Sequence, residues 1–170
     1  MNPCQPVRNR GIFRIYISKV TAIDSLTTLF LAGLHKEFDE IAEWVSSKMV
    51  LRDRGPQSVF ETTIRAVGGL AGAHALSGHP GLKARLVEFA DAIYPAFNTS
   101  SGLPKGRIDL VTHSTDYLPW MPKATTLADA GSLGLEMRYV TQVTKNSKYA
   151  TAAENAERTL WHSGTHTVVS

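Results

Sequence analysis

Apolar residues recur at intervals of three and four along most of the chain, which is the spacing of one face of a helix. Within residues 36–51 this face is formed by five apolar side chains: Phe38, Ile41, Ala42, Val45 and Met49. The opposite face is acidic, as expected for the solvent side of an amphipathic helix. The same period predicts further helices at the following positions: from Asp24 onward, 58–77, 81–97, 125–144 and 147–161.

Glycine and proline divide the helical segments. Residues 52–56 and the sequence Ser77-Gly-His-Pro80 are predicted breaks, since glycine can end one helix and proline can begin the next. A longer stretch, 98–121, has no helical period, and a loop of that length in a compact domain tends to serve function. Its Trp120 is expected to anchor the loop by packing, with stacking on a sugar as the alternative. No segment alternates as a strand would.

The predicted helices form three hairpins, 24–51, 58–97 and 125–161. Repeated helical hairpins indicate an all-α fold, either an α-solenoid or a closed α/α toroid in which each unit buries its face against the next. The first helix of each hairpin would line the inside and the second would form the outer wall. We divide the chain into three parts, as follows: an irregular segment 1–20, a helical domain 21–161 and a tail 162–170.

Composition narrows the class of protein. The 170 residues are 43% hydrophobic and 19% charged, as in globular proteins, and the net charge of +3 comes from scattered residues. Nothing in this pattern predicts nucleic-acid binding, because there is no basic stripe or aromatic platform. Neither a signal peptide nor a run of about 20 apolar residues that could span a membrane is visible. Cys4 is the single cysteine, so no internal disulfide can form.

Two charged residues lie on the otherwise apolar face of the 58–77 helix. Glu61 and Arg65 are four residues apart and share that face with Ile64, Gly68 and Gly72. Charge on an inward face is costly unless it is paired, so it calls for a reason. An ordinary ion pair is one reason, and a catalytic acid beside its electrostatic partner is the other. His74, on the same helix, is expected to be a hydrogen-bonded core histidine.

Five ordered segments of the chain resemble the class I α-1,2-mannosidases, glycoside hydrolase family 47. The most distinctive is Val59-Phe-Glu-Thr-Thr-Ile-Arg-Ala-Val-Gly-Gly69. The others are Ile23–Phe30, Lys36–Val45, the loop Tyr94-Pro-Ala-Phe-Asn-Thr-Ser-Ser-Gly-Leu-Pro104, and Leu127-Ala-Asp-Ala-Gly-Ser-Leu-Gly-Leu-Glu-Met-Arg-Tyr139. The resemblance covers about residues 20–160.

This resemblance implies a fold and an activity. The family fold is an (α/α)7 barrel, so the chain would supply three of seven hairpins, an incomplete toroid. Family members hydrolyse terminal α-1,2-linked mannose on high-mannose N-glycans with inversion, and they use a Ca²⁺ ion. The resemblance also implies the lumenal side of the secretory pathway, in the endoplasmic reticulum or Golgi. The direct protein ligand of the calcium and the catalytic base belong to later hairpins of the family, so the isolated chain is expected to be inactive.

The resemblance also assigns roles to individual residues. Glu61 matches the proposed general acid, and burial is expected to keep it protonated. Four residues match positions around the substrate: Arg65, Asp24, Asp129 and Glu136. Asp24 could instead cap its helix, and Glu136 could instead lie on the surface or in an ion pair. With Glu61, the residues Asp24 and Asp129 are expected near one rim of the toroid.

The chain departs from the family at two of these positions. Thr27 stands where the family usually has a second aspartate, and Asp129 stands where it usually has glutamate. Both changes support an alternative, a non-catalytic mannose-glycan-binding or glycoprotein quality-control relative. A third hypothesis, an unrelated helical-repeat interaction module, leaves the Phe60-Glu61 motif and the loop at 94–104 unexplained.

Overall fold

The computed structural model describes residues 14–51, 55–121 and 123–164. Its helices are α1 (Arg14–Leu31), α2 (His35–Ser47), α3 (Val59–Glu61), the π-helix η1 (Thr62–Val67), α4 (Gly68–Ser77), α5 (Pro80–Ile93), the 3₁₀ turn η2 (Tyr94–Phe97), α6 (Leu127–Gly131), α7 (Gly134–Thr144) and α8 (Lys148–Gly164). Its strands are β1 (Gln57–Ser58), β2 (Arg107–Ile108) and β3 (Thr115–Asp116). The chain is mostly helical, as predicted.

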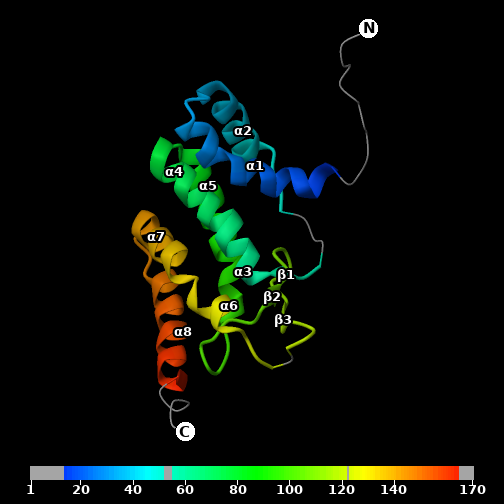
Figure 1. Ribbon diagram of the computed structural model, residues 1–170, viewed down its shortest axis with the longest axis vertical. Helices are drawn as coiled ribbons and strands as arrows, with labels where there is room; N and C mark the ends of the chain where they lie inside the picture. Colours follow the sequence, from blue (N-terminus) through cyan, green and yellow to red (C-terminus); the bar gives the residue numbers. More distant parts are fainter. Residues whose placement is uncertain (1–13, 52–54, 122, 165–170) are drawn as a thin grey trace.

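The helices pair into the three predicted hairpins, which follow one another along the long axis of the molecule (Figure 1). The first consists of α1 and α2, the second of α3 to α5, and the third of α6 to α8. Neighbouring hairpins join through their first helices, since α4 packs against α1 on one side and α7 on the other. Behind them, α2 packs against α5. This two-layer order is the one expected of part of a toroid.

The limits of the helices agree with the sequence in the middle of the chain and differ at its start. Gly78 ends α4 in the left-handed conformation with φ 67°, and Pro80 begins α5. In contrast, α1 begins at Arg14, inside the segment 1–20 that we expected to be irregular. Asp24 therefore lies in the interior of a helix, and the prediction that it caps one is wrong.

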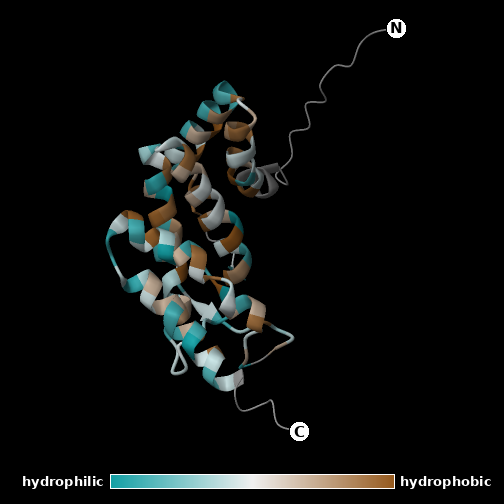
Figure 2. Cartoon of the chain, turned by 60° about the vertical axis from the view of Figure 1, so that its left-hand side comes forward, coloured by the Kyte–Doolittle hydropathy of each residue, from teal (hydrophilic) through white to brown (hydrophobic). Residues whose placement is uncertain are grey.

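The core lies between the layers, and Figure 2 shows hydrophobic residues gathered on the helix faces that meet. Leu26, Val45 and Leu70 are fully buried there. Helices α1 and α4 approach closely because Gly69 lies at their contact. A Cβ atom on Gly69 would fall 2.7 Å from Cγ2 of Ile23, closer than side chains come in real structures.

A small antiparallel sheet, which the sequence did not predict, braces the start of the second hairpin. Strand β2 pairs with β1 on one side and β3 on the other. Both β2 and β3 come from the stretch 98–121 that we expected to be irregular. Two-residue strands are too short to show alternation.

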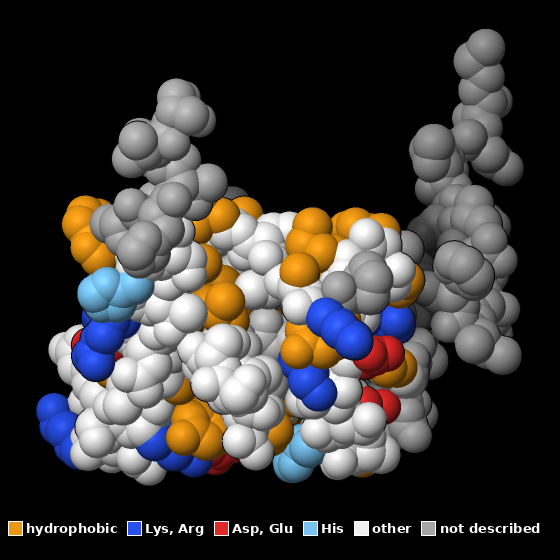
Figure 3. Space-filling model, turned by 90° about the horizontal axis from the view of Figure 1, so that it is seen from below, with side chains coloured by type: hydrophobic (Ala, Val, Ile, Leu, Met, Phe, Trp, Pro, Cys, Tyr) orange, Lys and Arg blue, Asp and Glu red, His pale blue; other side chains and the backbone are white. Residues whose placement is uncertain are grey.

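Several large apolar side chains are exposed on the third hairpin, the last in the row: Leu127, Leu135 and Trp161, with 73%, 77% and 74% of their surface accessible. Seen from below, apolar side chains reach the surface in several patches (Figure 3). Trp120 is also 73% exposed, so its expected role as a packed loop anchor is wrong. Among the described residues, no helix combines the length and hydropathy that crossing a membrane requires.

The contact at Gly69 generates a stability prediction. Alanine is a better helix former than glycine by about 1 kcal/mol. However, overpacking costs about 1–3 kcal/mol, and the β-branched Ile23 cannot easily turn away. We expect Gly69→Ala to lower the free energy of unfolding by up to about 2 kcal/mol in urea titrations, after the gain in helix propensity is subtracted. Gly131→Ala is the control, because its nearest neighbour would be Leu160 at 3.4 Å. Equal stability of the two variants would contradict the prediction.

The exposed apolar residues generate a second prediction, because such patches favour association. We expect the average mass of the purified chain to rise with concentration in sedimentation velocity. Leu135→Gln should reduce this association, whereas Lys83→Gln, on the exposed side of α5, should not. A monomer at every concentration with a sharp melt would show that the patches do not associate.

Candidate active site

The helical segment that carries Glu61 and Arg65, α3 to α4 (Val59–Ser77), is called the motif helix below. The small sheet and a side-chain cap fix the position at which it begins. The amide of Val59 donates to the carbonyl of Gly106 at 3.0 Å, in the turn that leads into β2. Ser58 caps the helix, since its hydroxyl accepts the amide of Glu61 at 3.1 Å. The stretch 98–121 therefore holds the first turn that carries Glu61.

Directly after Glu61 the helix widens into a π-helix, which the sequence did not predict. The amide of Gly68 reaches back five residues to the carbonyl of Thr63, the defining bond of this form. π-Helical segments are rare in proteins, and those that do occur are often found at functional sites. Glu61 is followed by a turn of this form, yet its carboxylate remains within ion-pair distance of Arg65.

Arg65 joins two carboxylates from different hairpins. Its Nη2 lies 2.7 Å from Oδ2 of Asp24 on α1, and its Nε donates to the same oxygen at 3.3 Å. Glu61 is more distant, with Oε2 at 3.9 Å from Nη1. The expected pair between Glu61 and Arg65 is thus present, but Asp24 is the closer partner.

Glu61 is exposed and not buried as expected, with 56% of its side chain accessible. Arg65 and Asp24 are 46% and 37% exposed. Ile64, expected to face inward, is 36% exposed. The first and third hairpins cover the flanks of the motif helix, while the turn carrying Glu61 faces open space. The expectation of burial fails because the packing described above covers Gly68 and Gly69 but not this turn.

A cavity of about 420 Å³ opens beside these charges. Glu61 and Arg65 contribute to its wall together with Gln57 and Ser58. The rest of the wall is mainly apolar and comes from α1, the segment that follows α2 and the outer helix α5: Val20, Ile23, Met49, Leu51 and Phe89. The carboxyl group of Glu61 and the guanidinium of Arg65 thus lie at a cavity whose walls are mainly apolar.

Glu136 occupies a different environment, between α7 and α4. It is 9% exposed, and its Oε2 has no hydrogen-bond partner. Its Oε1 would lie 3.3 Å from a Cβ atom on Gly68, so glycine makes room for the carboxyl group. Burial raises the pKa of Glu136, and the bond from its own backbone amide partly opposes this. The alternatives of a surface position or an ion pair are therefore wrong.

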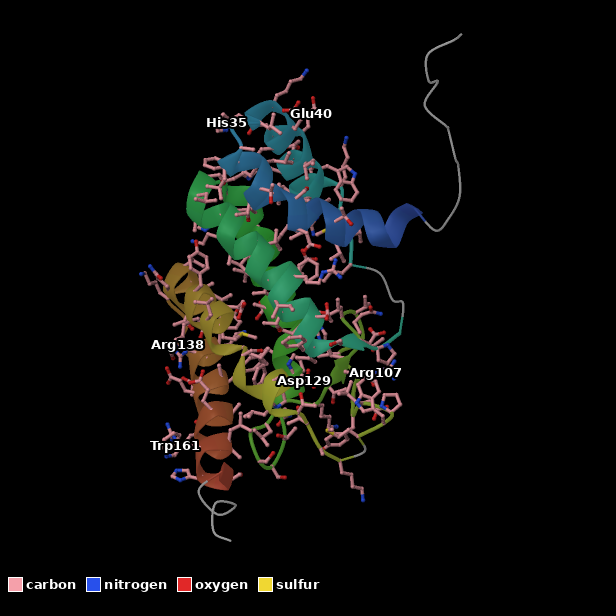
Figure 4. The ribbon with its side chains drawn as sticks, in the orientation of Figure 1. His35, Glu40, Arg107, Asp129, Arg138 and Trp161 are labelled. Atoms are coloured by element: carbon pink, nitrogen blue, oxygen red, sulfur yellow. The ribbon has the colours of Figure 1, made fainter. Side chains whose placement is uncertain are left out.

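Asp129 lies in the first turn of α6, where the hydroxyl of Thr126 accepts its amide at 3.0 Å. Helix α6 packs beside α3, and Figure 4 shows Asp129 below the start of the motif helix. Within the described part of the chain, its carboxylate forms no ion pair and does not join the Arg65 cluster. The structure therefore brings Asp24 and Glu61 together, with Asp129 on the neighbouring helix.

The other candidate residues have structural roles. Nδ1 of His74 lies 2.8 Å from the hydroxyl of Tyr139, which confirms His74 as a hydrogen-bonded histidine. Burial lowers the pKa of His74, and nearby Lys83 lowers it further. The described residues contain no group of three or more histidine, cysteine, aspartate or glutamate side chains that could hold a metal. They thus show no such cluster for the calcium ion that the resemblance implies.

Comparison with known proteins agrees with the motif. The sequence model of glycosyl hydrolase family 47 matches residues 2–169. The chain belongs to this family. It is 35% identical over 146 residues to human mannosyl-oligosaccharide 1,2-alpha-mannosidase IC, covering 85% of this chain and 23% of that protein. It is 38% identical over 130 residues to mannosyl-oligosaccharide alpha-1,2-mannosidase IA of Spodoptera frugiperda, covering 76% and 19%.

The structural comparison extends this to the fold. An alpha-1,2-mannosidase from Trichoderma reesei superimposes with a TM-score of 0.68 at 27% identity, covering 82% of this chain and 31% of that one. That enzyme is an α/α barrel, so the three hairpins are part of such a barrel. The chain spans about a quarter or less of the length of the two curated relatives named above.

The buried carboxyl of Glu136 generates a prediction about pH. Because its pKa is raised in the folded state, the folded chain binds more protons than the unfolded chain above about pH 4.3. The stabilising contribution is complete below that pH and is lost as pH rises through the raised pKa. We expect Glu136→Gln to gain stability relative to the unchanged chain as pH increases from about 4 toward neutrality.

Urea titrations across this pH range would measure the effect. Glu40→Gln, on the exposed face of α2, is the matched control and should follow the unchanged chain. Parallel stability curves for Glu136→Gln and the unchanged chain would contradict a buried, proton-binding carboxyl.

Proposed function

We propose that this chain forms the N-terminal part of the catalytic barrel of a mannosyl-oligosaccharide 1,2-α-mannosidase and supplies its general acid, Glu61. Family membership and the mannosidase relatives support this reading. The observation that carries it is the arrangement of the motif helix. Glu61 stands exposed beside a cavity while Asp24, on another hairpin, holds the neighbouring Arg65 at 2.7 Å.

In this mechanism Glu61 donates a proton to the oxygen of the departing sugar. General acids contribute about 10²–10⁴-fold to such reactions. Inversion requires a second carboxylate about 6.5–9.5 Å away that activates a water on the opposite face of the sugar. We assign that base to a part of the barrel outside this chain. The same part would enclose Glu61, whose side chain is 56% exposed here.

The neighbouring charges would orient the substrate. Arg65 offers several N–H donors to sugar oxygens, and Asp24 fixes its direction. Asp129 would contact the sugar from the third hairpin. Glu136 matches a position around the substrate, but its unpartnered Oε2 is buried between α7 and α4, so contact with a sugar would require this packing to open.

The remaining elements of the proposal rest on the resemblance alone. The substrate would be a terminal α-1,2-linked mannose of a high-mannose N-glycan. Calcium would bind outside this chain, and no step here depends on it. A place on the lumenal side of the secretory pathway accords with relatives named as endoplasmic reticulum enzymes, from human and from Schizosaccharomyces pombe.

A non-catalytic mannose-binding relative is the second candidate, favoured by Thr27. The hydroxyl oxygen of Thr27 would lie 3.2 Å from a Cβ atom on Gly72, so this residue packs against α4. It thus provides no carboxylate where the family usually has one.

A chimera tests the acid. Residues 20–161 would replace the matching segment of the Trichoderma reesei enzyme, and release of mannose from α-1,2-mannobiose would be measured with calcium and with a chelator. We expect calcium-dependent turnover that Glu61→Gln lowers by about 10²–10⁴-fold. Proton NMR should show β-mannose as the first product, the mark of inversion.

A control variant of the chimera and the isolated chain distinguish the catalytic hypothesis from the non-catalytic one. Glu40→Gln, a glutamate on the exposed face of α2, should leave turnover of the chimera unchanged. The isolated chain should release no mannose, and turnover there that Glu61→Gln abolishes would show that this segment is sufficient. Binding of mannobiose to the isolated chain that requires neither calcium nor Glu61 would favour the non-catalytic relative.

A further inference from the structure

The π-helix between Glu61 and Gly68 is held by the hydroxyls of two adjacent threonines. Oγ1 of Thr63 donates to the carbonyl of Val59 at 2.8 Å, and Oγ1 of Thr62 donates to the carbonyl of Ser58 at 2.7 Å. At this junction the carbonyl of Val59 accepts the amide of Thr62, three residues later, and the hydroxyl of Thr63 is its second donor. The two hydroxyls supply donors at this junction.

Thr63 is the more constrained of the two, since it is fully buried. A hydroxyl that donates to the carbonyl four residues back in its own helix often bends that helix. The widening begins immediately after Glu61 and includes Arg65. The widened segment therefore follows the proposed acid, Glu61, directly and contains its charged neighbour, Arg65.

The π-helical geometry explains why Arg65 lies closer to Asp24 than to Glu61. In a regular helix, residues four apart stack, and Arg65 would cover Glu61. In the π-helix, Arg65 approaches Asp24 at 2.7 Å and stands 3.9 Å from Glu61. The carboxylate of Glu61 consequently stays open beside the cavity.

We propose that Thr63 is a positioning residue, whose hydroxyl maintains the π-helix so that Arg65 pairs with Asp24 and leaves Glu61 open. Its significance for catalysis rests on the function proposed above for Glu61. The pairing itself is a property of this chain and can be measured without activity.

The test uses nuclear magnetic resonance of the full chain, with the Nε–Hε group of Arg65 as the reporter. Because Nε donates to Asp24, we expect its proton to exchange slowly with water, and Asp24→Ala, which removes this acceptor, gives the reference rate. Thr63→Val removes the hydroxyl and retains the shape. We expect it to accelerate Hε exchange roughly five- to tenfold, toward the value in Asp24→Ala. Thr63→Ser retains the hydroxyl and should restore slow exchange.

Thr144→Val is the matched control. Oγ1 of Thr144 makes the same kind of bond, to the carbonyl of Val140 at 2.7 Å, but at the end of the ordinary helix α7. It should lower stability without changing the Arg65 signal. The proposal is overturned if Thr63→Val leaves Hε exchange unchanged, if Thr63→Ser exchanges as fast as Thr63→Val, or if Thr144→Val has the same effect. It is also overturned if Thr63→Val fails to fold, because the hydroxyl would then serve the fold as a whole. The chimera assay on Glu61 is independent of each outcome.

Discussion

The close approach of three helices at α4 is the constraint on which this structure depends. Glycines occupy the contact positions toward both neighbours, with Gly69 against Ile23 of α1 and Gly68 against Glu136 of α7. A larger residue at either position would separate the hairpins and with them the charges they carry. The distance between Arg65 and Asp24 is therefore set by backbone packing as much as by attraction, since an exposed ion pair contributes at most about 1 kcal/mol.

The two carboxyl groups beside the motif helix show how environment separates residues of the same chemical type. Glu61 is exposed and lies within reach of a guanidinium, whereas Glu136 is buried with one oxygen unpartnered. Burial without a partner favours the neutral form of a carboxyl group. One short segment of barrel thus contains an exposed carboxyl group, Glu61, and a buried one, Glu136, whose pKa is raised by burial.

The sequence predicted what local periodicity controls and missed what depends on distant contacts. The three hairpins, the cap at Gly78 and the hydrogen-bonded His74 follow from spacing and residue type. The pairing of Arg65 with Asp24 joins residues 41 positions apart and has no local signal. The small sheet is too short to alternate. The sequence contains one feature that could have indicated the π-helix, the two adjacent threonines inside a predicted helix. β-Branched residues that can donate to the backbone are unusual in helix interiors.

The small sheet also has a consequence for how the chain folds. It joins Gln57 to Ile108, about fifty residues apart, whereas each helical hairpin closes over a shorter distance. Contacts between distant residues form late, because the loop-closing entropy must be offset before they contribute. The hairpins are therefore expected to assemble first, and the turn that carries Glu61 to become ordered only when the loop after the second hairpin returns to it. A slow folding phase should therefore report on the turn that carries Glu61 and not on the helices, which have already formed.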